Sequence, residues 1–207
     1  MSEINIRPLS EIVDDLWGAA PQPEAPKEKA PETPVYQPSF PPFEQLWKTA
    51  DDTVDWTDAL AHDRPTDNLT SPHLWAFFHQ HADRVLHGDL AAYIEVLKAA
   101  NPLGDMAPYG QSFDVEAASA DLLRVRFDVN PVYLGKEEGE VRRYLCGVSL
   151  RAARDLMALL PVREVSVEAR HQDAALLQVT FQRSELQKVR FSFIDPVAFV
   201  TACGASF

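Results

Sequence analysis

Apolar residues recur with a helical period at the front of the chain and again in its middle. The first stripe would lie on one face of a short helix over residues 1–18. It consists of Leu9, Ile12, Val13, Leu16 and Trp17. A helix this short is unstable alone in water because its nucleation is costly. We therefore predict that these residues form a docking element that needs a surface to bind.

Residues 19–42 have a composition that cannot form a core, with eight prolines set among Glu, Lys and Ala. This pattern predicts a disordered, Pro-rich acidic linker with extended, polyproline-like character. At roughly 3.1 Å per residue such a linker reaches about 75 Å. The docking helix could thus bind its own body in cis or another protein in trans, and trans is the favoured interpretation.

The remaining chain, residues 43–207, is predicted to form one domain that begins with a helical part over residues 43–101. Helical spacing from Phe43 to Val54 predicts a first helix. Ser71 and Pro72 provide a cap and a first helical residue, and Asp89 provides the next cap. We expect the two helices that follow these caps to form an αα-hairpin.

In residues 111–207 the apolar period changes to two, which is typical of half-buried strands. Three alternating segments, 123–129, 165–169 and 177–181, are interrupted by one long helical stripe from Val141 to Leu160. The predicted fold is therefore α+β. It has a small mixed sheet of about three to four strands, packed on one long helix in the order strand, helix, strand, strand.

The long helical stripe also predicts a core. Leu145, Val148 and Leu156 should face the sheet, while Arg151 and Arg154 have the pattern of ordinary helix surface. In the sheet, the residues expected opposite the helix are Val125, Phe127, Val167, Val179 and Phe181.

Charge narrows the classes of partner. The formal net charge is −12, and residues 1–70 carry 14 acidic against 5 basic side chains. An acidic surface repels phosphate backbones and anionic membranes, so nucleic acid and membrane binding are not expected. A protein partner with a basic rim would be attracted to the front half.

The predictions for cellular location and cofactors rest on motifs that the sequence lacks. Cys146 and Cys203 are far apart and belong to no paired thiol motif. The sequence shows no signal peptide pattern and no apolar run of membrane-spanning length. We predict a cytoplasmic protein without metal or cofactor.

Two clusters are candidates for chemistry. Arg124 and Arg126 on one strand, with Glu164 and Glu168 on another, could bind an anion or act in acid–base catalysis. The favoured interpretation is a ladder of cross-strand ion pairs on a solvated sheet face. His79, Asp83 and His87 share one helical stripe and could ligate zinc, although a solvated helix face is the favoured interpretation.

Three segments, 148–153, 158–161 and 193–196, resemble an uncharacterised bacterial domain that lies at the C-terminal end of proteins of unknown function. The resemblance covers roughly residues 90–196 and rests on packing and turn residues. It implies a bacterial, intracellular setting and no particular activity.

Three functions remain open from the sequence. The leading hypothesis is a non-enzymatic binding or adaptor protein, with the N-terminal helix as its docking element. An enzyme using the strand carboxylates is the second. The third is an acidic inhibitor, of the immunity type, that neutralises a basic protein.

Overall fold

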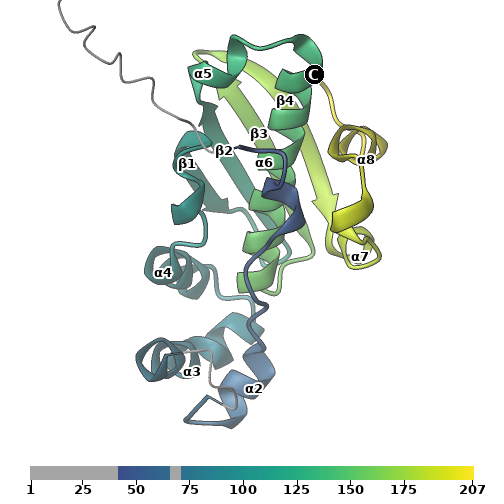
Figure 1. Ribbon diagram of the computed structural model, residues 1–207. Helices are drawn as coiled ribbons and strands as arrows, with labels where there is room; N and C mark the ends of the chain where they lie inside the picture. The colour runs from purple at the N-terminus through teal and green to yellow at the C-terminus, as the bar shows by residue number, and fades with distance from the viewer. Residues whose placement is uncertain (1–41, 66–70) are drawn as a thin grey trace, which may run out of the picture. The chain divides into compact units, whose positions relative to one another are not determined.

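Among the described residues the longest helix, α6 (Glu138–Leu159), packs on a four-stranded sheet (Figure 1). The computed structural model describes residues 42–65 and 71–207, all within one unit of the chain, Phe40–Phe207. The strands are β1 (Gly110–Ala117), β2 (Leu122–Val129), β3 (Glu164–His171) and β4 (Ala174–Gln182). The other helical elements are η1 (Leu46–Lys48), α2 (Trp56–Ala61), α3 (Pro72–Leu86), α4 (Leu90–Ala100), η2 (Gly104–Met106), α5 (Pro131–Leu134), α7 (Arg183–Leu186), η3 (Phe191–Phe193) and α8 (Pro196–Ala202).

The strands lie in the order β1-β2-β3-β4. β1 and β2 form an antiparallel pair, β2 and β3 are parallel and joined through α6, and β3 and β4 form a second antiparallel hairpin. The α+β class and the mixed sheet on one long helix, both predicted from the sequence, are confirmed.

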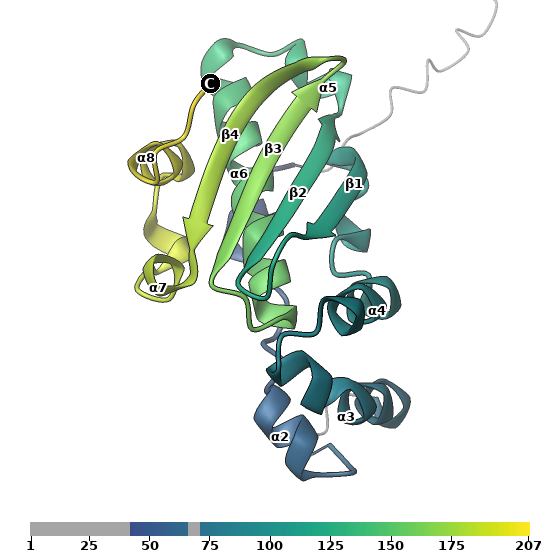
Figure 2. The same ribbon diagram turned by 180° about the vertical axis from the view of Figure 1, so that it is seen from behind.

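One face of the sheet is buried, and the described residues leave the other face bare (Figure 2). Along β2, buried residues such as Val125 and Phe127 alternate with exposed Arg124 and Arg126. Figure 2 shows the other side, where no described helix crosses the strands. The predicted sheet positions Val167, Val179 and Phe181 are each at most 4% exposed, as expected for the face that α6 covers.

A segment that we call the strap, residues 43–56, runs along the side of α6 that faces away from the sheet (Figures 1 and 2). The Val54 amide donates to the Ala158 carbonyl at 2.9 Å, and the Trp56 indole donates to the Leu159 carbonyl at 2.7 Å. A Cβ atom added at Gly147 would lie 3.0 Å from the Trp47 ring. The strap is thus in close contact with α6, and every residue of α6 from 144 to 153 is buried.

The strap corrects one prediction. Helical spacing from Phe43 to Val54 predicted a helix, but only the short η1 forms there, and Val54 lies in an irregular segment before α2. The apolar residues Phe43, Leu46 and Trp47 are buried as the pattern requires. They are buried because they pack against α6 and its surroundings. The apolar spacing from Phe43 to Val54 therefore indicated which residues are buried, but it did not indicate a helix.

The predicted αα-hairpin is present as α3 and α4. Ser71 accepts from the Leu74 amide at 3.3 Å, and Asp89 accepts from the Ala91 amide at 2.8 Å, so both predicted caps are confirmed. Asn101 ends α4 in the left-handed conformation.

The sequence did not resolve β1 as a separate strand. Its alternation is short, and a bulge between Gln111 and Asp114 shifts its register against β2, with Ser112 at a φ of 52°. A bulge adds one residue to the strand and so breaks the period of two. The sheet therefore has one further strand, β1, in front of the predicted strand-helix-strand-strand order, and β1 forms a hairpin with β2.

None of the helices in residues 42–65 and 71–207 combines the length and the apolar composition needed to cross a membrane.

Candidate functional site

The bare face of the sheet gathers the four side chains that the sequence singled out. Arg126 on β2 is the register neighbour of Glu168 on β3, and Arg124 is the neighbour of Ser166. Glu164 lies two positions before Ser166 and therefore points to the same side. Because the strands alternate, all four predicted residues share one face.

These charges are only loosely paired. Arg124 lies 3.9 Å from Glu116 on β1, with both side chains more than half exposed. Arg170 lies 3.2 Å from Glu168 on the same strand. Within the described residues no ion pair joins Arg126 to Glu168, although they are direct neighbours in register. An exposed pair such as Arg124 with Glu116 contributes about 0–1 kcal/mol, so Arg124 can exchange Glu116 for a carboxylate of a partner at small cost.

The two carboxylates do not converge on one point. Glu164 and Glu168 are four residues apart on one strand, which corresponds to about 13 Å at a rise of about 3.3 Å per residue. Pairs of carboxylates that act on one glycosidic bond lie about 5–9.5 Å apart. The arrangement suits recognition over a broad surface better than concerted acid–base chemistry.

A polar hollow of about 460 Å³ lies at the β4 side of this face. Its lining includes Arg124 and Glu168 together with residues of the C-terminal tail. The tail is held there by Ser206, whose amide donates to the Gln178 carbonyl at 3.0 Å while its carbonyl accepts from the Gln178 amide at 2.9 Å. The lining residues are Arg124, Ser166, Val167, Glu168, Gln178, Val179, Thr180, Cys203, Gly204 and Ser206.

A buried ionic cluster lies on the side of α6 that faces away from the sheet, and no local pattern in the sequence indicates it. Arg151 is 6% exposed and forms an ion pair through Nε with Asp155, which is fully buried. The same guanidinium donates to Thr49 Oγ1 at 2.6 Å and lies 3.3 Å from Asp51 and 3.1 Å from Asp105. Arg151 therefore connects α6 to the strap and to η2.

Two predictions about α6 are corrected by this cluster. Arg151 was expected on ordinary helix surface, but it is buried. Arg154 also binds the strap, donating to the Trp47 carbonyl at 2.5 Å and the Thr49 carbonyl at 3.0 Å. A helical period cannot reveal partners 100 residues away in the sequence, which is the separation of Arg151 and Asp51.

The cluster makes stability depend on pH. Burial raises the pKa of Asp155 to about 6, although the Asp51 amide at 2.9 Å and Arg151 oppose the shift. The stabilising contribution of a carboxyl whose folded pKa is raised is complete below its unfolded pKa, about 4. That contribution is lost as the pH rises through about 6.

We therefore expect the free energy of unfolding of the wild type to fall relative to Asp155→Asn between pH 4 and 7, by about 1–3 kcal/mol. Urea unfolding of both proteins at several pH values measures this difference. Asp51, whose pKa burial also raises, titrates in the same direction and is present in both proteins. A difference that is constant or grows with pH would show that Arg151 keeps Asp155 ionised throughout.

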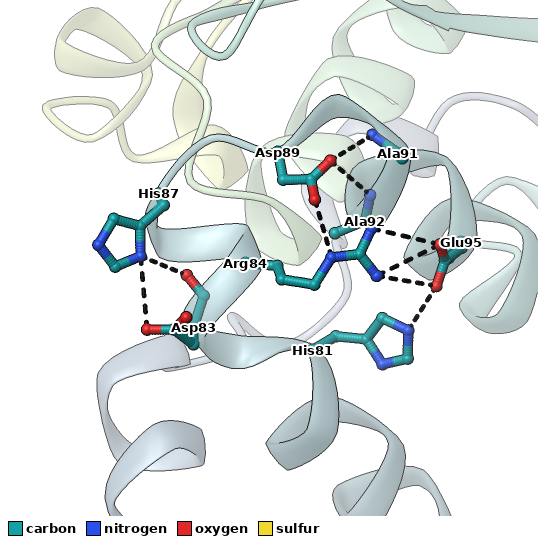
Figure 3. A network of polar contacts seen from close by, with 8 residues as sticks. All are labelled: His81, Asp83, Arg84, His87, Asp89, Ala91, Ala92 and Glu95. Atoms are coloured by element: carbon teal, nitrogen blue, oxygen red, sulfur yellow. Dashed lines mark hydrogen bonds and ion pairs between the residues drawn. The ribbon is translucent and has the colours of Figure 1, made fainter.

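The helical hairpin holds a second polar network (Figure 3). The ring of His81 on α3 lies 2.7 Å from Glu95 on α4, and Arg84 bridges Glu95 at 3.3 Å and Asp89 at 2.8 Å. The His81 contact, supported by Arg84, holds the pKa of the Glu95 carboxyl below its usual range. This network ties α3 to α4.

The metal candidates do not converge in this hairpin. His79 Nδ1 lies 2.7 Å from the Ala59 carbonyl on α2, whereas His87 lies 3.4 Å from the Asp83 carboxylate near the end of α3. In the part of the chain that the structure describes, no group of three or more His, Cys, Asp or Glu side chains could hold a metal ion.

The predicted docking residues Leu9, Ile12, Val13, Leu16 and Trp17 lie outside the described residues, as does nearly all of the predicted linker 19–42. Comparison of the chain with protein-family models, with curated proteins and with solved structures finds no match. The resemblance of residues 90–196 to an uncharacterised bacterial domain stays a prediction.

Proposed function

We propose that this chain is a non-enzymatic binding protein whose partner is another protein. The observation that carries the proposal is the bare sheet face. It presents side chains of both signs, including Arg124, Arg126 and Glu168, and their ion pairs within the described residues are few: Arg124 lies 3.9 Å from Glu116, and Glu168 lies 3.2 Å from Arg170. A broad face of this kind, together with the polar hollow at its β4 side, offers many polar contacts across an interface.

The front of the chain supplies a second contact in this proposal. The apolar stripe that ends in Leu16 and Trp17 would bind a groove on the partner as an amphipathic helix, in trans. The acidic residues Glu11, Asp14 and Asp15, which lie between the apolar ones, and the net charge of −12 favour a partner with a basic rim. The proposal includes a bacterial cytoplasm, where the free thiols Cys146 and Cys203 would stay reduced.

Affinity capture with the full-length protein tests the proposal. Arg124→Glu/Arg126→Glu should weaken the affinity for the captured partner at least about tenfold, a loss of about 1.4 kcal/mol in binding free energy, because both side chains belong to the face. Leu16→Asp/Trp17→Asp should also reduce it, through loss of the helix contact. Arg163→Glu/Lys188→Glu changes the charge equally at exposed positions elsewhere and should leave capture unchanged.

Three outcomes would contradict or change the proposal. Capture that is insensitive to both test variants would remove the bare face and the stripe as binding elements. Unfolding of the monomer by Leu16→Asp/Trp17→Asp would assign the stripe to the body instead of a partner. If the captured protein is a basic enzyme that loses activity in proportion to added chain, the inhibitor hypothesis replaces the adaptor.

A further inference from the structure

The two edge strands of the sheet, β4 and β1, differ in how far their outer backbone groups are paired. The β4 edge is partly covered, because the C-terminal tail pairs with it through Ser206 and Gln178. β1 forms the other edge, and among the described residues its only strand partner is β2. An edge strand presents unpaired N–H and C=O groups that can pair with another chain.

The register identifies which backbone groups are free. The Ala118 amide donates to the Leu122 carbonyl at the turn between β1 and β2. Hydrogen-bonded pairs alternate in an antiparallel ladder, so the next ones are Glu116 with Arg124 and Asp114 with Arg126. The backbone groups of Val115 and Ala117 therefore point away from β2, toward the open edge.

An apolar groove of about 360 Å³ lies between this edge and α4. Ile94 of α4, 42% exposed, lines it although most large apolar side chains of the unit are buried. The side chain of Val115 is on the core side of β1, as its register neighbour Val125 shows. The lining residues are Ile94, Leu97, Lys98, Asn101, Pro102, Leu103, Phe113, Asp114 and Val115.

Charge selects the kind of strand that fits. Asp114 and Glu116 are exposed on the bare-face side of β1, so they flank the free backbone of Val115. A second copy of β1 centred on Val115 would place Asp114 directly opposite Glu116 of that copy, and like charges in this position are destabilising. Lys98, the cation among the groove residues, is exposed on α4.

We infer that the edge of β1 binds an extended segment of a partner protein as a fifth strand, with apolar side chains in the α4 groove and basic side chains opposite Asp114 and Glu116. The inference rests on the proposed protein-binding function and specifies the class of segment that is bound. Main-chain hydrogen bonds give such strand addition its affinity, and the alternating side chains give its specificity. The net charge of −12 attracts a basic segment.

The test uses three six-residue peptides with the full-length protein. One alternates lysine and valine, a second alternates glutamate and valine, and the third is the lysine peptide with N-methylated valines, which cannot donate to Val115. We expect the lysine peptide to slow amide hydrogen exchange at Val115 and Ala117, measured by NMR. The other two should bind at least about tenfold more weakly, a difference of about 1.4 kcal/mol.

A matched pair of variants locates the groove. Ile94→Ser should weaken binding of the lysine peptide, whereas Leu60→Ser on α2, where the side chain is 43% exposed, should not. Both positions are exposed, so neither change should prevent folding. Equal binding of the lysine and N-methylated peptides would overturn the inference, because attraction by charge alone needs no backbone pairing.

Other occupants would also overturn it. Protection of Val115 that appears without peptide and grows with protein concentration would assign the edge to a second copy. Protection that disappears when residues 1–41 are deleted would assign it to the chain itself. Failure of the peptides while capture still depends on Arg124 and Arg126 would leave the proposed function standing and remove only this site.

Discussion

Arg151→Met is expected to lower the free energy of unfolding by about 3–5 kcal/mol, the usual range when one partner of a buried ion pair is removed. Asp155 is fully buried and would lose the cation that compensates it. The strap would also lose its contacts through Thr49 and Asp51. Urea denaturation at pH 7 measures the change.

A control substitution on the same helix, Arg142→Met, separates the effect of losing a positive charge from the effect of losing a buried ion pair. Arg142 forms an ion pair with Glu138 at 3.1 Å, but the two side chains are 47% and 83% exposed. Arg142→Met should therefore change the free energy of unfolding by less than about 1 kcal/mol. Equal effects of Arg142→Met and Arg151→Met would show that the buried cluster has no special role.

A double variant tests the origin of the loss. Buried ion pairs replaced by apolar residues of similar size are often neutral or stabilising. Arg151→Met/Asp155→Leu should therefore be more stable than Arg151→Met alone. If the double variant instead loses the sum of the stability lost by Arg151→Met and by Asp155→Leu, compensation of Asp155 is not the origin of the effect. The stability then comes from the contacts of Arg151 with the strap and η2, through Thr49 and Asp105.

Leu156→Ala is expected to cost about 2–5 kcal/mol, the range for a buried leucine. Leu156 has no exposed surface, and it lies five residues after Arg151, about 140° around the helix, on the side toward the sheet. The sheet and the strap enclose α6 from both sides, which limits relaxation around the cavity. Urea denaturation again measures the change.

Val132→Ala provides the comparison, since Val132 is 46% exposed on α5 and loses two methyl groups. Its effect should stay within about 0.5 kcal/mol. A loss below about 0.5 kcal/mol for Leu156→Ala would mean that this part of α6 does not pack against the sheet as described.

The candidate site could be predicted in part. The alternation of apolar and polar residues placed Arg124 and Arg126 on the polar side of one strand and Glu168 on the polar side of another. The parallel register of β2 and β3 then brings all three to the same face of the sheet. The sequence could not specify that Glu116 on β1 would be the partner of Arg124, because β1 was not resolved as a strand. Cross-strand neighbours depend on register, which the bulge in β1 shifts by one residue.

The free edge of β1 and its groove were also invisible in the sequence. Ile94 belongs to the apolar stripe of α4 and has the pattern of a core residue, yet it is 42% exposed. Its exposure depends on how far α4 lies from β1, which no local pattern encodes.

The sequence by itself determined where helices and strands form in most of residues 71–207, because periodicity, caps and turn residues act within a few positions. It also determined the acidic charge and the polar character of one sheet face. Only the tertiary structure decided that the strap lies along α6 and that Arg151 and Asp155 are buried together. The physical reason is that burial of a charge is tolerated only with partners in place, and those partners, Asp51 and Asp105, are brought to Arg151 by packing across 100 and 46 residues of chain.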